Sequence, residues 1–306
     1  TIPTRYNSTK GTAASFNMYR LLQTSLVLAA SCIFTSSPVA FALSTASTPR
    51  KKVAVFGGTG FVGSAVCERL VKRGHEVTAV SRRGVNPRPD DEYLSQVNWV
   101  SGDATDANTV KKVINNCDAC VHAVGLLFDV DSGLAGLNTI VSGSGSLPGE
   151  SSTYDAITRQ TMFNVIDAIE KKASFPFGGN SKFPLCFVSC AEAGWPDVPL
   201  GPTVDKLAPE WLQKYLAAKR AVEARLQSSS KIRSSIYRPS LIWDWKKLDV
   251  LPVIPVFNLA SAIGVPFVDK TVRVETLADA IVQGIEDDSV EGVQRYMNME
   301  ELASRP

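Results

Sequence analysis

The segment at residues 52–74 restricts the fold of this chain more than any other part of the sequence. Residues 52–57 (KVAVFG) form a short apolar run rich in β-branched side chains, which is typical of a buried parallel strand. The glycine-rich run GGTGFVG begins at Gly57, and residues 60–73 have the apolar spacing of a helix that Gly74 ends. A strand, a glycine turn and a helix in this order predict the first part of a βαβ unit.

The glycine turn has the features of a pyrophosphate-binding loop. Gly58 and Gly60 carry no Cβ, so the backbone can turn tightly and approach a pyrophosphate, while Gly63 lets the helix pack close to the sheet. Free N–H groups at the start of the helix attract the anionic phosphates. An alternative is a structural turn in a protein that has lost its ligand. The sequence predicts a dinucleotide site whose first contacts are Gly57, Gly58, Thr59, Gly60, Phe61, Val62 and Gly63.

Strand and helix patterns alternate along the rest of the 306-residue chain. Further strands are predicted at residues 76–80, 97–103, 118–125, 185–189 and 233–239, and further helices at residues 106–115, 153–172, 209–227 and near 276–286. We therefore expect an α/β fold, a doubly wound parallel sheet of the Rossmann type in residues 51–306, with residues 240–306 contributing a small C-terminal substrate lobe. The connection at residues 126–152 is too long for a plain connector, so we expect a functional or a mobile loop.

The residues after the second strand bear on which dinucleotide is bound. NAD-preferring sites place Asp or Glu there to bond the ribose hydroxyls, whereas this chain has Ser81, Arg82 and Arg83. Arginine pairs with a 2′-phosphate in a forked geometry, so NADP(H) is the favoured cofactor and NAD(H) the alternative. Solvated loop charges are the simpler interpretation of the two arginines. The further predicted cofactor contacts are Ser81, Arg82, Arg83, Asp103 near the adenine, and Ala123 and Gly125 beside the nicotinamide ribose.

Tyr215 and Lys219 form the predicted catalytic pair. They stand four residues apart, on one face of the helix predicted at residues 209–227. A nearby lysine ammonium lowers the pKa of a phenol, so Tyr215 would exchange a proton near neutral pH, and Lys219 would also bond the nicotinamide ribose. The alternative is a surface helix in which Tyr215 is half-buried. His122 is interpreted as a strand residue rather than a catalyst.

Residues 52 to about 302 resemble the extended and atypical short-chain dehydrogenase/reductases. The resemblance rests on the glycine motif, GDATD at residues 102–106, the Tyr215 and Lys219 pair, and YRPSLIWD at residues 237–244. It implies a Ser or Thr after the fifth strand that polarises the substrate oxygen. By spacing this hydroxyl falls near Ala191, which leaves Ser189 as the substitute, and Thr158 stands where the family often has Asn.

Within that superfamily the chain is similar to a divergent branch. The branch includes the NAD(P)H-binding accessory subunit of mitochondrial complex I, a yeast protein implicated in coenzyme Q biosynthesis and a plant plastid relative. The matching stretches are VFGGTGFVG, AVSRRG, VHAVGLL, YDAITRQT, YLAAKRAVEAR and YRPSLIWD. The resemblance implies a link to quinone or redox metabolism, and a nucleotide that often serves stability or assembly.

Residues 1–50 have the composition of a targeting segment. The first acidic residue is Glu68, and an apolar run at residues 21–34 follows Met18, where we expect the signal to begin. The run is too short for a membrane span of ~20 residues, so a secretory-type signal fits better. SPVA followed by Phe41 and a Ser/Thr/basic stretch is similar to two-part plastid signals. We predict a plastid location, with the mitochondrion as the alternative.

Composition and the remaining motifs indicate which ligands and partners the chain is expected to bind. Net charge is +2, without a basic stripe, so no nucleic-acid partner is expected. The six cysteines and two histidines predict no metal site. Cys117 and Cys120, the only close pair of note, are interpreted as small buried hydrophobes rather than a zinc or redox pair. The apolar stretch at residues 242–267 predicts either an ordinary lid or a surface for a quinone-like, lipophilic ligand or a membrane.

Two functions are compatible with these observations. The first is a reductase, epimerase or dehydratase in which Tyr215 is the acid/base, Lys219 tunes it and Ser189 donates a hydrogen bond. The second is a non-catalytic accessory or assembly factor, stabilised by its nucleotide, in quinone biosynthesis or in a membrane electron-transfer complex.

Overall fold

The computed structural model describes residues 49–129, 152–173, 181–245 and 254–306, together with Ser132, Gly133, Ala135, Asn138 and Gly149. Thr48–Pro306 form one compact unit. Almost all of the predicted targeting segment at residues 1–50 and most of the predicted long loop at residues 126–152 lie outside the described residues. The expectations for both stay predictions.

In the described part of the chain, seven parallel strands form the main sheet, in the order β3-β2-β1-β4-β5-β6-β9. They are β1 (Lys52–Phe56), β2 (Glu76–Ser81), β3 (Asn98–Ser101), β4 (Ala119–His122), β5 (Phe183–Val188), β6 (Ile232–Tyr237) and β9 (Gly292–Gln294). The chain reverses its direction across the sheet between β1 and β4, where doubly wound folds bind ligands at the carboxyl ends of the strands. The predicted Rossmann-type parallel sheet is confirmed.

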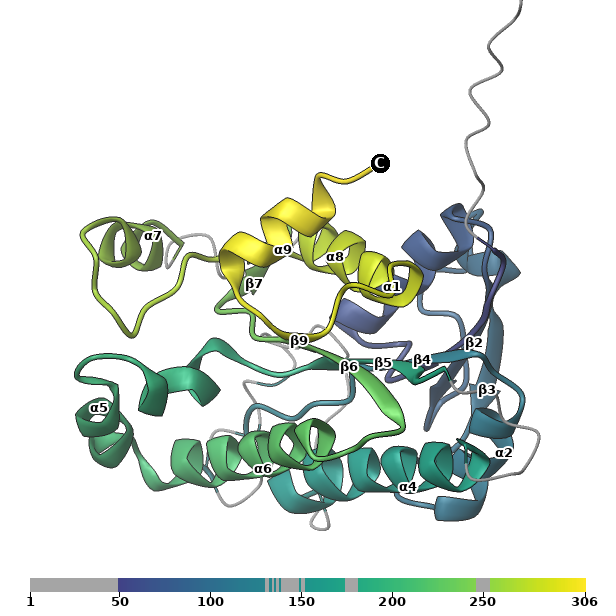
Figure 1. Ribbon diagram of the computed structural model, residues 1–306, viewed down its shortest axis with the longest axis horizontal. Helices are drawn as coiled ribbons and strands as arrows, with labels where there is room; N and C mark the ends of the chain where they lie inside the picture. Colours follow the sequence, from purple (N-terminus) through teal and green to yellow (C-terminus); the bar gives the residue numbers. More distant parts are fainter. Residues whose placement is uncertain are drawn as a thin grey trace, which may run out of the picture. The chain divides into compact units, whose positions relative to one another are not determined.

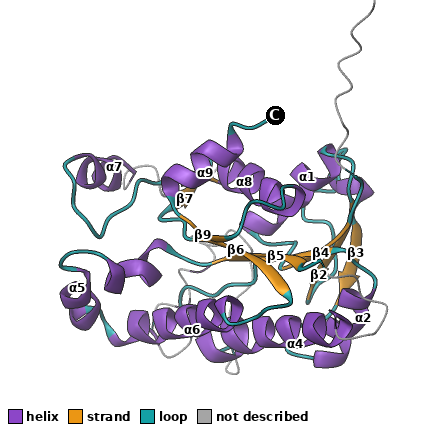
Figure 2. Cartoon of the chain, viewed as in Figure 1, coloured by secondary structure: helices purple, strands orange, loops and turns teal. Residues whose placement is uncertain are grey.

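Helices cover both faces of this sheet, as Figures 1 and 2 show. One face carries α1 (Phe61–Lys72), α8 (Val274–Glu286) and α9 (Tyr296–Ala303). The other carries α2 (Ala107–Asn115), α4 (Thr161–Ala173) and α6 (Glu210–Gln227). Each layer has its own hydrophobic core, because successive strand side chains point to opposite faces. In β1, Val53 and Val55 join the core under α1 and α8, while Ala54 and Phe56 join the core under α4 and α6.

The helix predicted at residues 153–172 begins with a π-helical segment, η4 (Asp155–Gln160), before α4. The Thr161 hydroxyl donates a hydrogen bond to the Ile157 carbonyl, 2.7 Å away, and so contacts the backbone of this turn. Side-chain bonds of this kind compete with the regular helical ladder. Thr158 lies inside η4 and is fully buried.

Shorter elements gather beside the carboxyl ends of β5 and β6. They are η5 (Ala191–Asp197), α5 (Gly201–Leu207), β7 (Ile242–Trp243), α7 (Ile254–Ala262) and β8 (Val272–Arg273), while η1 (Leu94–Gln96) precedes β3. Within residues 240–306, β7 pairs with β8, whereas α8, β9 and α9 complete the main sheet and its helical layer. None of the helices in the described residues is long and apolar enough to cross a membrane.

Candidate nucleotide and substrate site

Two cavities lie at the carboxyl edge of the sheet and share part of their walls. The first has a volume of about 480 Å³ and extends from the glycine loop along the ends of β2 and β3. The second has a volume of about 590 Å³ and extends from the same loop toward α6 and α7. The residues common to both are Gly60, Ala123, Val124, Gly125 and Leu126. A third cavity, of about 670 Å³, lies at the opposite edge and is lined by none of the predicted site residues.

Different contacts require glycine at each of the glycine positions in the loop. Gly57 has φ +83°, and a Cβ there would lie 2.8 Å from the Ala123 carbonyl carbon. A Cβ on Gly63 would lie 2.1 Å from the Gly57 carbonyl oxygen, so only glycine lets α1 begin this close to β1. Gly58 packs against the Ala79 side chain of β2, and neither Gly58 nor Gly63 lines a cavity. Gly60 lines both cavities, which fits close approach of a pyrophosphate.

The other predicted cofactor contacts fall on the walls of these cavities. Thr59 lines the first cavity, and Phe61 and Val62 line the second. The first cavity is also lined by Ser81, Arg82, Arg83, Asp103, Ala123 and Gly125. The loop after β2 is fixed in place, because Ser81 Oγ accepts from the Gly84 N–H at 3.0 Å and Ser101 Oγ donates to the Arg82 carbonyl at 2.9 Å. Its two arginine side chains are exposed at the cavity.

Tyr215 and Lys219 lie together on the wall of the second cavity. Both are buried, and the Lys219 Nζ is 5.7 Å from the centre of the Tyr215 ring. The ammonium donates a hydrogen bond of 2.7 Å to the Val188 carbonyl at the end of β5. The structure therefore brings the pair together on the wall of the second cavity and does not place Tyr215 on a half-exposed surface helix.

The direction of the Tyr215 pKa differs from the prediction. Burial raises the pKa of this phenol well above its usual value, and the nearby Cys190 and Glu192 add to the rise. Burial also lowers the pKa of Lys219. The sequence argument considered only the attraction between a phenolate and an ammonium, whereas the loss of water around a fully buried phenol is the larger effect. Tyr215 is thus a neutral phenol in this structure.

Ser189 lies in the second cavity, but its hydroxyl points to another partner. Ser189 Oγ hydrogen bonds Glu223 Oε1 of α6, whose carboxylate also binds the Arg238 guanidinium at 2.5 and 3.2 Å. Both charged side chains are largely buried. Because the carboxylate can only accept, the Ser189 proton is used in this bond, and the predicted donation to a substrate oxygen would require it to break.

A family model described as NAD(P)H-binding matches residues 57–288 of this chain. The chain belongs to this NAD(P)H-binding family. Together with the doubly wound sheet and the glycine loop, the match identifies it as an atypical short-chain dehydrogenase/reductase. The expected NAD(P) cofactor is confirmed at that level, because the matched residues include the loop and both walls of the first cavity.

Relatives and solved structures agree with this assignment. An uncharacterised chloroplastic protein of Arabidopsis thaliana is 27% identical over 278 residues, 85% of this chain and 80% of the relative. MIOREX complex component 2 of Saccharomyces cerevisiae is 25% identical over 216 residues, 63% of this chain and 73% of the relative. A Serratia marcescens short-chain dehydrogenase/reductase has the same fold, with a TM-score of 0.56 at 13% identity, covering 83% of this chain and 99% of that structure.

Two side chains of this family member that sequence reasoning did not single out lie beside Tyr215. They are Cys190 and Glu192, which follow β5 and line the second cavity. Burial raises the pKa of the Cys190 thiol to about 12, and both Cys190 and Glu192 add to the rise in the pKa of Tyr215. Burial raises the pKa of Glu192 above its usual value. The only sequence clue was their place next to Ala191, where the resemblance implied a catalytic group.

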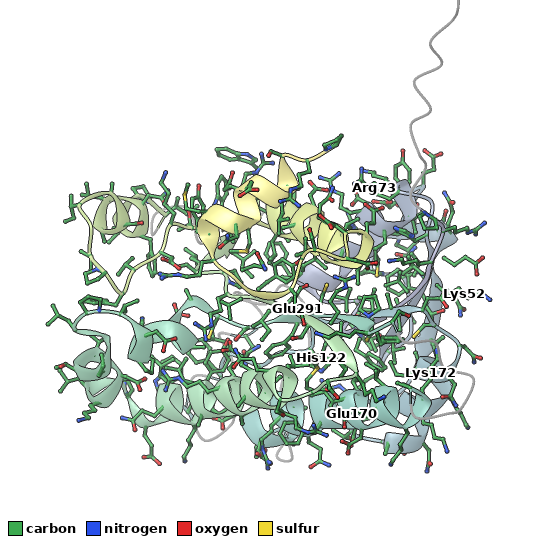
Figure 3. The ribbon with its side chains drawn as sticks, in the orientation of Figure 1. Lys52, Arg73, His122, Glu170, Lys172 and Glu291 are labelled. Atoms are coloured by element: carbon green, nitrogen blue, oxygen red, sulfur yellow. The ribbon has the colours of Figure 1, made fainter. Side chains whose placement is uncertain are left out.

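His122 is a buried strand residue in this family member. It ends β4 and lies in the interior of the molecule (Figure 3). Its Nε2 is 2.9 Å from the Thr161 hydroxyl. Burial lowers the pKa of His122 to about 3. The imidazole is therefore neutral at physiological pH, as expected for a core histidine.

The described cysteines are all free and buried: Cys67, Cys117, Cys120, Cys186 and Cys190. Burial raises the pKa of Cys117 to about 12, so its thiol is protonated at neutral pH. Across the described residues no group of three or more His, Cys, Asp or Glu side chains is placed to hold a metal ion.

Proposed function

We propose that this protein is an NADP(H)-dependent oxidoreductase of an organelle that acts on an apolar carbonyl or quinone-like compound. The observation that carries the proposal is the second cavity, which continues from the nucleotide-side cavity and ends on an aromatic wall. Its apolar lining includes Trp195, Trp211, Leu212, Phe257 and Phe267. Apolar cavities with a few convergent polar groups are the usual form of small-molecule sites.

The residues around the shared wall support a hydride-transfer reaction. NADP(H), when bound, supplies or accepts the hydride. Gly60 and the α1 N-terminus would hold the pyrophosphate, and Arg82 and Arg83 a 2′-phosphate. Lys219 would hold the nicotinamide ribose, and Tyr215 would lie against the reacting end of the substrate. The aromatic wall would then exclude water from the reaction.

Turnover tests the proposal directly. Purified residues 48–306 would be mixed with NADPH and with ketones and quinones that differ in side-chain length, and absorbance would report NADPH oxidation. We expect turnover to rise with apolar character, and Trp211→Ala to reduce the preference for long side chains. Val85→Ala, a change at an exposed apolar residue outside this cavity, is the control. Turnover independent of side-chain length would contradict the apolar substrate.

A second function is supported by the Ser189 hydrogen bond to Glu223 and by the missing hydroxyl at Ala191. These features favour a non-catalytic accessory factor whose nucleotide stabilises the fold, in a quinone-biosynthetic or membrane electron-transfer complex. The name of the yeast relative as a complex component agrees with this alternative. Binding of NADPH without turnover, together with co-purification in a stable complex from the organelle, would favour it over the enzyme.

We also propose a plastid location, with the mitochondrion as the alternative. The proposal rests on the composition of residues 1–50 and on the chloroplastic relative, whereas the yeast relative belongs to a MIOREX complex. Fluorescent fusions of residues 1–50 and of the whole chain would be compared in an algal cell. Plastid import of the fusion that carries only residues 1–50 is expected, and Phe41→Ala should reduce it.

A further inference from the structure

Ser189 lies directly after β5, and hydrogen bonds hold both its backbone and its proton. Its N–H donates to the Tyr237 carbonyl of β6 at 2.7 Å, and its hydroxyl donates to Glu223 Oε1 of α6. The residue is buried and lines the second cavity. What Ser189 offers to a ligand in this cavity therefore depends on Glu223.

The Glu223 carboxylate is held in turn by Arg238. The guanidinium Nε is 3.2 Å from both carboxylate oxygens, and Nη2 is 2.5 Å from Oε2. Only 4% of the Glu223 side chain and 12% of the Arg238 side chain are exposed. Breaking a buried charge pair is strongly unfavourable, so the carboxylate stays in place. Because a carboxylate only accepts hydrogen bonds, it fixes the direction of the Ser189 proton.

The lone pairs of the Ser189 hydroxyl are left for a ligand. A hydroxyl has one proton and two lone pairs, and within the described part of the chain no N–H or O–H group donates to this oxygen. The Lys219 ammonium, one turn before Glu223 on α6, donates instead to the Val188 carbonyl at 2.7 Å. Ser189 therefore presents an acceptor to the cavity, which is the reverse of the donor role that the sequence resemblance implied.

A carbonyl oxygen has a separate donor on the same wall. Tyr215 is a neutral phenol, and it lines the second cavity together with Ser189. A phenol donates one hydrogen bond, which suits the oxygen of a carbonyl that is to be reduced. The cavity thus contains a donor for a carbonyl and, at Ser189, an acceptor for a second polar group.

We propose that Ser189 is a specificity-determining residue that accepts a hydrogen bond from a hydroxyl group of the substrate, separate from the carbonyl that is reduced. This inference rests on the proposed function and narrows its substrate class to apolar hydroxyketones and hydroxyquinones. A hydroxyl suits the site better than an ammonium, because the largely apolar wall does not compensate the loss of water around a charge. A methoxy or methyl analogue would leave the Ser189 oxygen without a donor.

The first test measures binding and needs no turnover. Aryl ketones that carry a hydroxyl, a methoxy or a methyl group at the same meta or para position share one carbonyl and differ in the second group. Calorimetric titration of residues 48–306, which contain the whole sheet and its cores, would give the Kd of each ketone in the presence of NADP⁺. We expect the hydroxyl compound to bind about tenfold more tightly than the methoxy compound, the usual order for an acceptor otherwise left unpaired.

Ser189→Ala assigns this preference to one residue. The variant should bind the hydroxyl and methoxy compounds alike. Ser95→Ala, which removes an exposed hydroxyl outside the cavity, is the matched control and should keep the preference. A preference that survives in Ser189→Ala would overturn the inference, because the cavity carboxyl groups of Glu192 and Asp269 would then be the acceptors. An equal loss of affinity for all three ketones would also overturn it, because Ser189 would then donate to their shared carbonyl.

NADPH oxidation separates this inference from the proposed function. We expect kcat/KM of the unsubstituted protein to be about tenfold higher for the hydroxyl compound than for the methoxy compound, and the two values to be equal in Ser189→Ala. Turnover of both compounds with equal kcat/KM by the unsubstituted protein would overturn the inference alone. Tighter binding of the hydroxyl compound without NADPH oxidation would remove the proposed reaction and leave the role of Ser189 in binding. No binding of any ketone would remove both.

Discussion

The glycines after β1 are not equivalent, and their neighbours predict different effects of the same substitution. A Cβ at Gly63 would lie 2.1 Å from the Gly57 carbonyl oxygen, a backbone atom that cannot move aside. A Cβ at Gly60 would lie 3.1 Å from the same oxygen, and Gly60 lines both cavities. The sequence pattern correctly grouped these residues as one motif. The pattern assigned Gly63 to packing and Gly58 and Gly60 to the ligand, whereas Gly58 packs against Ala79 and lines neither cavity, a contact that depends on the neighbouring strand β2.

Gly63→Ala should therefore destabilise the fold. We expect a loss of at least about 1–3 kcal/mol in the free energy of unfolding, the usual cost of overpacking. Urea unfolding followed by circular dichroism measures it. Gly149→Ala, where no atom of the described residues lies within 4 Å of the added Cβ, is the control and should change stability by less than about 0.5 kcal/mol. Equal stability of both variants would contradict the close packing of α1.

His122 should make the stability of the protein depend on pH. Its folded pKa, about 3, lies below its ordinary value of 6.5, so between these values the unfolded chain binds a proton that the folded chain does not. Stability should be fully present above pH 6.5 and fall as pH drops toward 3, with a slope from this group of at most about 1.4 kcal/mol per pH unit. His122→Leu should have a shallower slope in urea unfolding between pH 4 and 6.5. An identical slope would contradict a neutral, buried His122.

At the scale of elements, one buried ion pair joins β5, α6 and β6. Glu223 of α6 binds Arg238 after β6 and Ser189 after β5. Glu223→Ala would leave the largely buried guanidinium without this carboxylate, and we expect a loss of about 3 kcal/mol in stability. Glu210→Ala removes an exposed ion pair with Lys214 from the same helix and should cost less than about 1 kcal/mol. Thermal unfolding of both variants measures the difference, and similar melting temperatures would contradict the linkage.

The sequence predicted the long regular elements and missed the short ones. The strands at the centre of the sheet are continuous apolar runs, and the helices have a clear apolar face, so local pattern was sufficient for them. The three residues of β9 and the eight of α9 carry too little pattern, and tertiary pairing with β6 and α8 determines them. Likewise, the Tyr215 and Lys219 spacing predicted a pair, while the raised Tyr215 pKa depends on burial and on Cys190 and Glu192.

At the scale of the whole molecule, exposed apolar side chains gather on the two helices beside the second cavity. They are Leu200 and Leu207 at α5, and Val256, Leu259 and Ile263 at α7. None of the residues of α7 is buried. Val204 and Phe257 of the same helices line the cavity, so the exposed surface continues into it. This continuity is what the predicted membrane-facing role of residues 242–267 requires, because a lipophilic substrate would then enter the cavity from the lipid surface.

Leu259→Glu should accordingly weaken binding of residues 48–306 to vesicles of a neutral and anionic phospholipid mixture. A charge on α7 opposes insertion of its apolar face into the interface. Vesicle flotation measures the bound fraction. Val85→Glu, at an exposed apolar residue that does not line the cavity, is the control and should bind as the unsubstituted protein does. No binding by the unsubstituted protein, or an equal loss in both variants, would contradict the lipid surface.

The central claim is that the first cavity, beside the glycine loop, binds NADP(H). A thermal-shift titration of residues 48–306 tests this claim most directly. A ligand that binds only the folded state raises its stability by about 2.7 kcal/mol at a hundred times its Kd. We predict that NADPH raises the melting temperature at lower concentration than NADH does, and that Arg82→Ala with Arg83→Ala removes this difference. No shift with either nucleotide would contradict the site, and equal shifts would contradict the preference for NADP(H).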